Sequence, residues 1–228
     1  MKRFMKLLII VAVVLVIAAV YEDSKDKEAT DALTRGLIDR IERGRDEVLA
    51  SAENKGVALR DMLTLSSIEC GSFTRDGARE MLVLVKVNGK YLAHPDGFDR
   101  TIAAIFAQDS SLLCQTTFAA DNVFVTSLDE PAENREAGRR RRILYIGRTT
   151  YTGMSSYDAA LYEVTAQNTF ERMPLADVDL PDDCAYTYGD GALHVFTQNM
   201  RHESEKPFRE YVGSFYWDNV RGVFTNAE

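Results

Sequence analysis

The chain has 228 residues, of which 46% are hydrophobic and 27% are charged, and its formal net charge is −8. These ordinary globular values exclude a disordered, collagen-like or low-complexity protein. The length suits one domain with appendages. Only one segment is apolar enough to enter a bilayer, which excludes a polytopic membrane protein. The acidic balance argues against nucleic acid as a partner, because neutralising phosphates needs a basic face.

Residues 1–21 have the pattern of an export or anchoring signal. Basic residues up to Lys6 precede an unbroken apolar run from Leu7 to Val20, and acidic residues follow from Glu22. This charge asymmetry keeps the N-terminus in the cytoplasm and sends the rest across the membrane. The run is short for a span of about 20 residues, but Phe4–Tyr21 gives 18 residues and approaches that length if Lys6 snorkels. A signal-anchor, a cleaved signal peptide and a buried core helix therefore all stay open.

The signal predicts a place in the bacterial cell envelope for residues 22–228. They are expected to be periplasmic and tethered to the inner membrane, or secreted where the signal is cleaved. The membrane is thus the first expected partner, through the N-terminal apolar segment. Without the basic start the remainder is more acidic still, so it repels anionic lipid and nucleic acid.

Residues 22–66 predict an amphipathic helix. The segment has no proline, and its apolar residues recur at helical spacing: Leu33, Leu37, Ile41, Val48, Ala52, Leu59 and Leu63. Glycines at 36, 44 and 56 each disfavour a helix interior by about 1 kcal/mol and predict breaks or a kink. The helix either packs on its own domain or forms a stalk that associates with a protein partner or a second copy.

The body from residue 70 onward predicts a mainly antiparallel β-sheet. Asn88-Gly89 lies between two β-rich runs and favours a type I′ hairpin, whereas Asp99–Leu113 fits a short helix. Further strands are predicted, separated by short polar turns that imply antiparallel pairing: Asn122–Leu128, Arg142–Thr150, Ala159–Ala166, Ala185–Tyr188, Ala192–Gln198, Glu210–Trp217 and Gly222–Thr225. The predicted fold class is α+β: a membrane anchor (1–21), a helical segment (22–69) and a strand-rich domain (70–228).

Turn residues recur with a faint rhythm in this body. Asn88, Asp121, Ser156 and Asp190 are separated by 33 to 35 residues. Periods of this size are typical of β-repeat architectures such as propellers. The segments between them do not align, so an irregular meander is the main expectation.

Two groups of residues are candidates for ligand binding. His94 and Asp96 lie in a polar turn that could form the rim of a site, although a hairpin end explains them as well. Arg140 and Arg142 belong to a run of four arginines suited to an anion, or to a strand start with solvated side chains. Trp217 and the C-terminal tyrosines could stack on a ligand, but cross-strand packing accounts for the same enrichment.

The sequence gives little support for a metal site or for a functional cysteine motif. Four aspartates in one loop, Asp177, Asp179, Asp182 and Asp183, are weak calcium candidates without EF-hand spacing. No zinc or C-x-x-C motif occurs, and three cysteines allow at most one intrachain disulfide. No cofactor is therefore expected.

Several common catalytic and nucleotide-binding signatures are absent from the sequence. It has no G-x-S-x-G, Walker A or G-x-G-x-x-G motif. The leading hypothesis is therefore a non-catalytic binding or interaction domain outside the cytoplasm. An envelope hydrolase is the least favoured alternative.

A local resemblance suggests a further alternative. The apolar segment, the long helix and then VLVKVNGKYLAHPDGF (Val83–Phe98) resemble the opening of extracytoplasmic Cache sensor domains, whose strand–turn–strand reads D-x-x-G-x-x-x-x-HP. Gly89 and His94-Pro95 keep this spacing, but Lys86 stands at the acidic position, and no second apolar span follows. The resemblance implies a PAS-like antiparallel sheet that senses a small ligand.

The predicted topology can be tested with a fusion. Alkaline phosphatase joined after Glu228 should be active in cells, because that reporter matures only in an oxidising compartment. Cellular phosphatase activity is the measurement, and the same fusion without residues 1–21 is the control. Activity of a cytoplasm-only reporter at the same position would contradict the topology.

Overall fold

The computed structural model describes residues 36–40, 63–87, 99–128, 140–151, 154–199 and 208–226. The chain divides into two units, residues 1–43 and 44–228. In the first unit, residues 36–40 are helical. In the second unit the described residues form strands, so that strand accounts for 70% of the described chain and helix for 4%. The predicted mainly antiparallel sheet is thus confirmed.

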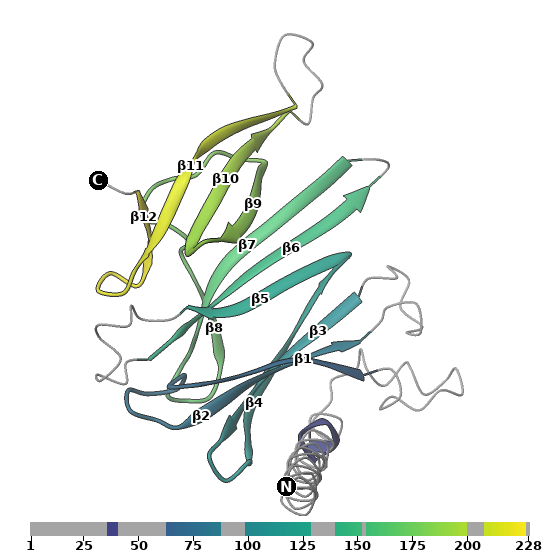
Figure 1. Cartoon of the computed structure of the whole chain (residues 1–228), viewed down its shortest axis with the longest axis vertical. Coiled ribbons are helices and arrows are strands. Elements are labelled where there is room, and N and C mark those ends of the chain that lie inside the picture. The colour runs from purple at the N-terminus through teal and green to yellow at the C-terminus, as the bar shows by residue number, and fades with distance from the viewer. Residues whose placement is uncertain are drawn as a thin grey trace, which may run out of the picture. The chain divides into compact units, whose positions relative to one another are not determined.

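The described strands form three four-stranded antiparallel sheets, and within each sheet the strands pair in chain order (Figure 1). The first sheet contains β1 (Leu63–Gly71), β2 (Glu80–Val87), β3 (Asp99–Ala107) and β4 (Leu112–Ala120). The second contains β5 (Asn122–Leu128), β6 (Arg142–Tyr151), β7 (Met154–Val164) and β8 (Phe170–Met173). The third contains β9 (Cys184–Gly189), β10 (Ala192–Gln198), β11 (Arg209–Asp218) and β12 (Val223–Asn226).

The second sheet packs against both of the others. Along β6, Ile143 and Tyr145 belong to a core shared with the first sheet, whereas Leu144 and Ile146 belong to a core shared with the third. Successive residues of a strand point to opposite faces, so an unbroken apolar run can supply both cores. The three sheets therefore stack in the order in which they occur along the chain, with the second sheet in the middle.

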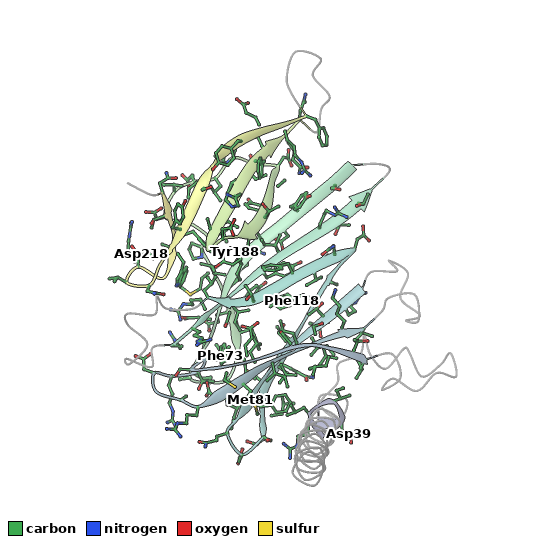
Figure 2. The ribbon with its side chains drawn as sticks, in the orientation of Figure 1. Asp39, Phe73, Met81, Phe118, Tyr188 and Asp218 are labelled. Carbon is green, nitrogen blue, oxygen red and sulfur yellow. The ribbon has the colours of Figure 1, made fainter. Side chains whose placement is uncertain are left out.

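Aromatic rings fill the core between the first two sheets. Phe118 on β4 stacks on Tyr145 with ring centroids 4.6 Å apart, and Tyr162 meets Phe118 edge-on at 5.3 Å. Figure 2 shows Phe118 in this layer. A Cβ added at Gly147 would collide with the Tyr145 hydroxyl, so glycine leaves room for the ring. Burial raises the pKa of Tyr145 to about 12, which keeps its hydroxyl neutral.

A buried carboxylate shapes the connection between β1 and β2. Glu80 accepts hydrogen bonds from the backbone nitrogens of Phe73 at 2.7 Å and Thr74 at 2.9 Å, and also from the Thr74 hydroxyl. Because charge-assisted hydrogen bonds of this kind are among the stronger ones, they offset the cost of burying the carboxylate. The turn that carries Asp76 is thereby held in one conformation.

Most strands predicted after residue 121 are confirmed, and two of them, Asn122–Leu128 and Ala192–Gln198, match β5 and β10 residue for residue. The predicted turn at Asp190-Gly191 is also confirmed. Both residues have positive φ, 52° and 76°, as a type I′ turn requires.

The predicted helix at Asp99–Leu113 is wrong, because β3 and the start of β4 occupy it. Both faces of β3 are buried, since Ala103 and Ile105 lie in the core shared with the second sheet while Ile102 and Ala104 are also fully buried. Burial on both faces removes the period-two pattern, and the alanines favour a helix by propensity. Tertiary packing overrides that preference.

The predicted hairpin turn at Asn88-Gly89 lies outside the described residues. The run before it forms β2, whose last residue, Val87, pairs with Leu63 of β1 on one side and with Arg100 of β3 on the other. In addition, β1 begins at Leu63, inside the range expected to be helical. The membrane anchor and most of the predicted helix lie outside the described residues.

The faint sequence rhythm does not mark equivalent places in the fold. Asp121 lies between two sheets, Ser156 lies within β7, and Asp190 lies in a hairpin turn of the third sheet. Asn88 lies outside the described residues. The repetition that the structure does contain is the four-stranded meander itself.

The double burial of β6 leads to a stability prediction. Ile143→Ala and Leu144→Ala should each lower the free energy of unfolding by about 2–5 kcal/mol, because each leaves a cavity in a different core. Denaturant unfolding of the full-length chain is the measurement. Val220→Ala is the control, since Val220 is 86% exposed and its loss should change stability by less than about 0.5 kcal/mol. A negligible effect of Leu144→Ala would refute the packing of the third sheet on the second.

Candidate functional site

A pocket of about 210 Å³ lies where turns and strand ends of all three sheets meet. We call it the arginine pocket. The first sheet contributes the β1–β2 turn, the second contributes the end of β5 and the start of β6, and the third contributes the β11–β12 turn. Its lining residues are Asp76, Leu128, Arg140, Arg141, Arg142, Trp217, Asn219, Val220, Arg221 and Gly222.

Backbone contacts with the first sheet position the arginine run. The Arg140 nitrogen donates to Asp76 Oδ1 at 2.7 Å, and the Arg141 nitrogen donates to the Ser72 carbonyl at 2.7 Å. Gly71 allows the close approach, because a Cβ there would lie 2.6 Å from Arg141 Nε. The run is therefore fixed by a segment about 70 residues earlier in the chain.

Glu163 on β7 connects two of the arginines. Its Oε2 atom lies 2.7 Å from Arg140 Nη2 and 2.8 Å from Arg142 Nη2. The three side chains are mostly buried, with exposed fractions of 29%, 16% and 19% for Arg140, Arg142 and Glu163. One carboxylate thus serves two guanidinium groups that would otherwise repel each other in a poorly solvated place.

Arg142 retains unused hydrogen-bonding capacity. Burial lowers the pKa of its guanidinium, and Glu163 opposes that shift. Its Nε atom is buried and has no hydrogen-bond partner among the described residues. A buried donor without an acceptor is costly, so a bound oxygen atom at this place would be favourable.

The third sheet forms the opposite wall with a tight turn. Asp218 Oδ1 accepts hydrogen bonds from the nitrogens of Val220 at 2.8 Å and Arg221 at 3.0 Å. Gly222 closes the turn with a φ of +68°, a conformation that glycine adopts without strain. Arg221 Nη1 in turn lies 2.5 Å from Asp177 Oδ2.

Trp217, in the same wall of the pocket, also packs against the core between the second and third sheets. Its ring meets Phe224 edge-on at 5.6 Å, and its Nε1 donates to Asn219 Oδ1. Along the same strand, β11, Phe215 is buried and Trp217 is half-buried, whereas Val212 and Tyr216 are 39% and 46% exposed.

The chemistry of the lining favours anion binding. Four guanidinium groups line the pocket, and four carboxylates lie on or beside it: Asp76, Glu163, Asp177 and Asp218. Guanidinium presents paired donors that match a carboxylate or phosphate. Among the described residues that line the pocket there is no serine, cysteine, histidine or tyrosine to act as a nucleophile.

The structure brings three of the predicted binding residues, Arg140, Arg142 and Trp217, into this one pocket. His94 and Asp96 lie outside the described residues. Sequence reasoning missed Glu163 and Arg221. Their contacts with Arg140 and Asp177 join positions 23 and 44 residues apart, and no local motif signals such contacts.

The calcium candidates are not brought together. Asp177 pairs with Arg221, Asp179 is exposed, and Asp182 and Asp183 line a different cavity. In the part of the chain that the structure describes, no group of three or more histidine, cysteine or acidic side chains is arranged to hold a metal ion.

The three cysteines are unpaired and lie outside the pocket. Cys70 is exposed. Burial, with a smaller contribution from Glu80, raises the pKa of Cys114 to about 12. Cys184 is buried, and its Sγ donates to the Pro181 carbonyl at 3.0 Å. The raised pKa keeps the Cys114 thiol protonated and poorly nucleophilic near neutral pH.

Comparisons with known proteins add no assignment. No family model, no curated protein and no solved structure matches the chain. Among the described helical residues, no segment has the length and apolar character needed to cross a membrane.

The Glu163 bridge leads to a second stability prediction. Glu163→Gln should lower the free energy of unfolding by about 1–3 kcal/mol, because it leaves two partly buried guanidinium groups without their counter-charge. Denaturant unfolding is the measurement. Asp158→Asn is the matched control, since the Asp158–Arg172 pair is more than half exposed and should contribute less than about 1 kcal/mol. Equal effects of the two substitutions would contradict the role assigned to Glu163.

Proposed function

We propose that the protein is a non-catalytic binding domain that recognises a small anionic ligand, through a carboxylate or phosphate group, in the arginine pocket. The observation that carries this proposal is the convergence of four arginines from two sheets on one cavity of about 210 Å³. Surface arginines are commonly spread out and solvated. Here several are held in place by backbone and ion-pair contacts before any ligand arrives, which lowers the entropic cost of binding.

The charge balance of the pocket supports an anion over a cation or a neutral ligand. Arg140 and Arg142 share one carboxylate, Glu163, at 2.7 and 2.8 Å. The unpartnered Arg142 Nε adds a donor that needs an acceptor. An incoming carboxylate or phosphate would supply both negative charge and acceptor oxygens.

We further propose that this domain acts outside the cytoplasm, tethered to the inner membrane or secreted. The N-terminal charge pattern and apolar run support this location. Self-association through the predicted helix of residues 22–66 remains part of the proposal. In this arrangement the domain would capture a small anion in the cell envelope.

A Cache-type sensor domain is a second candidate, since a small-ligand pocket is what such a domain needs. The segment that carries the resemblance, Val83–Phe98, is described only as far as Val87. The resemblance implies one PAS-like sheet, whereas the described residues form three meanders. For this reason the sensor ranks second, and an envelope hydrolase ranks behind it.

Trp217 provides a built-in reporter for the proposed ligand, because it is the chain's single tryptophan and lines the pocket. Titration of the full-length chain with inorganic phosphate, sulfate or citrate should give a saturable change in tryptophan fluorescence for at least one anion. Arg142→Ala should weaken that binding by about tenfold or more, as expected for a lost charged contact worth at least about 1.4 kcal/mol.

Arg172→Ala is the control for this titration, because Arg172 is an exposed arginine paired with Asp158 outside the pocket. Its affinity should equal that of the unmodified chain. Increasing sodium chloride should progressively lower the affinity for the anion, because salt screens the attraction between the ligand and the arginines. The absence of a saturable response, or equal affinity in Arg142→Ala, would refute the proposal.

A further inference from the structure

A second recess lies between the second and third sheets and shares no lining residue with the arginine pocket. It consists of two adjoining cavities of about 270 and 290 Å³, which have Tyr157 of β7 and Tyr186 of β9 in common. We call the pair the tyrosine groove. Their combined size falls within the range of about 300–1,000 Å³ that is usual for ligand sites.

One half of the tyrosine groove is walled by aromatic rings. Phe124 of β5 and Tyr188 of β9 join the two shared tyrosines there, with the Phe124 and Tyr188 centroids 6.1 Å apart. Figure 2 marks Tyr188 on the side of the third sheet. Phe124 is 39% exposed, so a large apolar ring is open to solvent at this place. Exposed rings of this kind offer flat faces to apolar C–H groups of a ligand.

Neighbouring contacts hold the shared tyrosines in place. Arg209 Nη2 donates to the Tyr157 hydroxyl at 2.9 Å, and its guanidinium carbon lies 5.6 Å from the centre of that ring. Burial, and then Cys184, raise the pKa of Tyr186 to about 12, so its hydroxyl remains neutral. The Tyr157 ring is therefore held in place before a ligand arrives, which reduces the entropy lost on binding.

The other half of the groove is rich in hydrogen-bond acceptors. Asp182 and Asp183 line it together with Gln198. The Gln198 side chain is held by its Nε2 atom, which donates to the Ser155 carbonyl at 3.2 Å. This contact identifies which end of the amide is nitrogen. Its Oε1 atom is then buried without a donor among the described residues, in a side chain of a residue only 8% exposed.

We infer that the tyrosine groove binds a neutral oligosaccharide. A sugar ring has an apolar C–H face suited to the aromatic half and hydroxyl donors suited to Gln198 Oε1 and the aspartates. The two carboxylates disfavour an acidic sugar, and Arg148, which lines the aromatic half, disfavours an organic cation there. This site is independent of the anion site proposed above.

Calorimetric titration of the full-length chain with cellohexaose, maltohexaose and chitohexaose tests the inference. At least one of them should bind saturably, while an oligogalacturonate of similar length should not. The sugar should leave Trp217 fluorescence unchanged, and citrate should not displace it, because the two sites share no residue. A failure at the arginine pocket would therefore leave this result intact, and the reverse also holds.

Two variants locate the sugar. Phe124→Ala should weaken binding by about tenfold or more, since stacking contributes on the order of 1–3 kcal/mol. Tyr216→Ala is the matched control, because Tyr216 is a similarly exposed ring on the outer face of β11, and it should bind the sugar as the unmodified chain does. Gln198→Leu should weaken binding while keeping the side chain's approximate size. If either groove variant fails to fold, Arg148→Ala replaces it: Arg148 lines the aromatic half, and removing its guanidinium donors should weaken binding of the sugar hydroxyls.

Three results would overturn the inference. The first is no saturable heat with any of the three neutral sugars. The second is binding of a sugar with unchanged affinity in folded Phe124→Ala and Arg148→Ala. The third is binding of tetramethylammonium but no sugar, which would make the groove a cage for organic cations.

Discussion

The packing of one sheet between two others is the constraint on which the rest of the structure depends. Successive residues of β6 must fill different cores. Ile143 and Tyr145 lie in the core shared with the first sheet, and Leu144 and Ile146 lie in the core shared with the third. A one-residue slip in pairing would exchange these two sets. Such a slip would break the Phe118–Tyr145 stack and move the Tyr145 ring out of the space that Gly147 leaves for it.

The same layering creates both candidate sites. Turns of the first and third sheets reach the start of β6 at one place, where Asp76 holds the Arg140 backbone and Glu163 holds two guanidinium groups. Elsewhere the second and third sheets enclose the tyrosine groove. Both sites therefore sit at sheet junctions, where loops and strand edges expose polar groups that a continuous core would exclude.

The two sites differ in the hydrogen-bonding groups that they offer to a ligand. The arginine pocket carries surplus donors, with Arg142 Nε unpartnered among the described residues, whereas the tyrosine groove carries a surplus acceptor in Gln198 Oε1. Donor-rich and acceptor-rich sites select opposite partners by the cost of leaving buried groups unpaired. A domain with both sites would take two separate ligands of opposite hydrogen-bonding character.

By itself the sequence determined the strand-rich body, most strands after residue 121 and the turn at Asp190, and it named Arg140, Arg142 and Trp217 as separate candidates for ligand binding. These follow from local signals: alternation, turn chemistry and a run of like charges. Tertiary structure alone decided that residues 99–107 form a strand, that this strand pairs with β2, and that Glu163 and Arg221 join the site. The reason is physical: burial on both faces erases periodicity, and contacts between distant residues depend on how sheets stack, which no local pattern encodes.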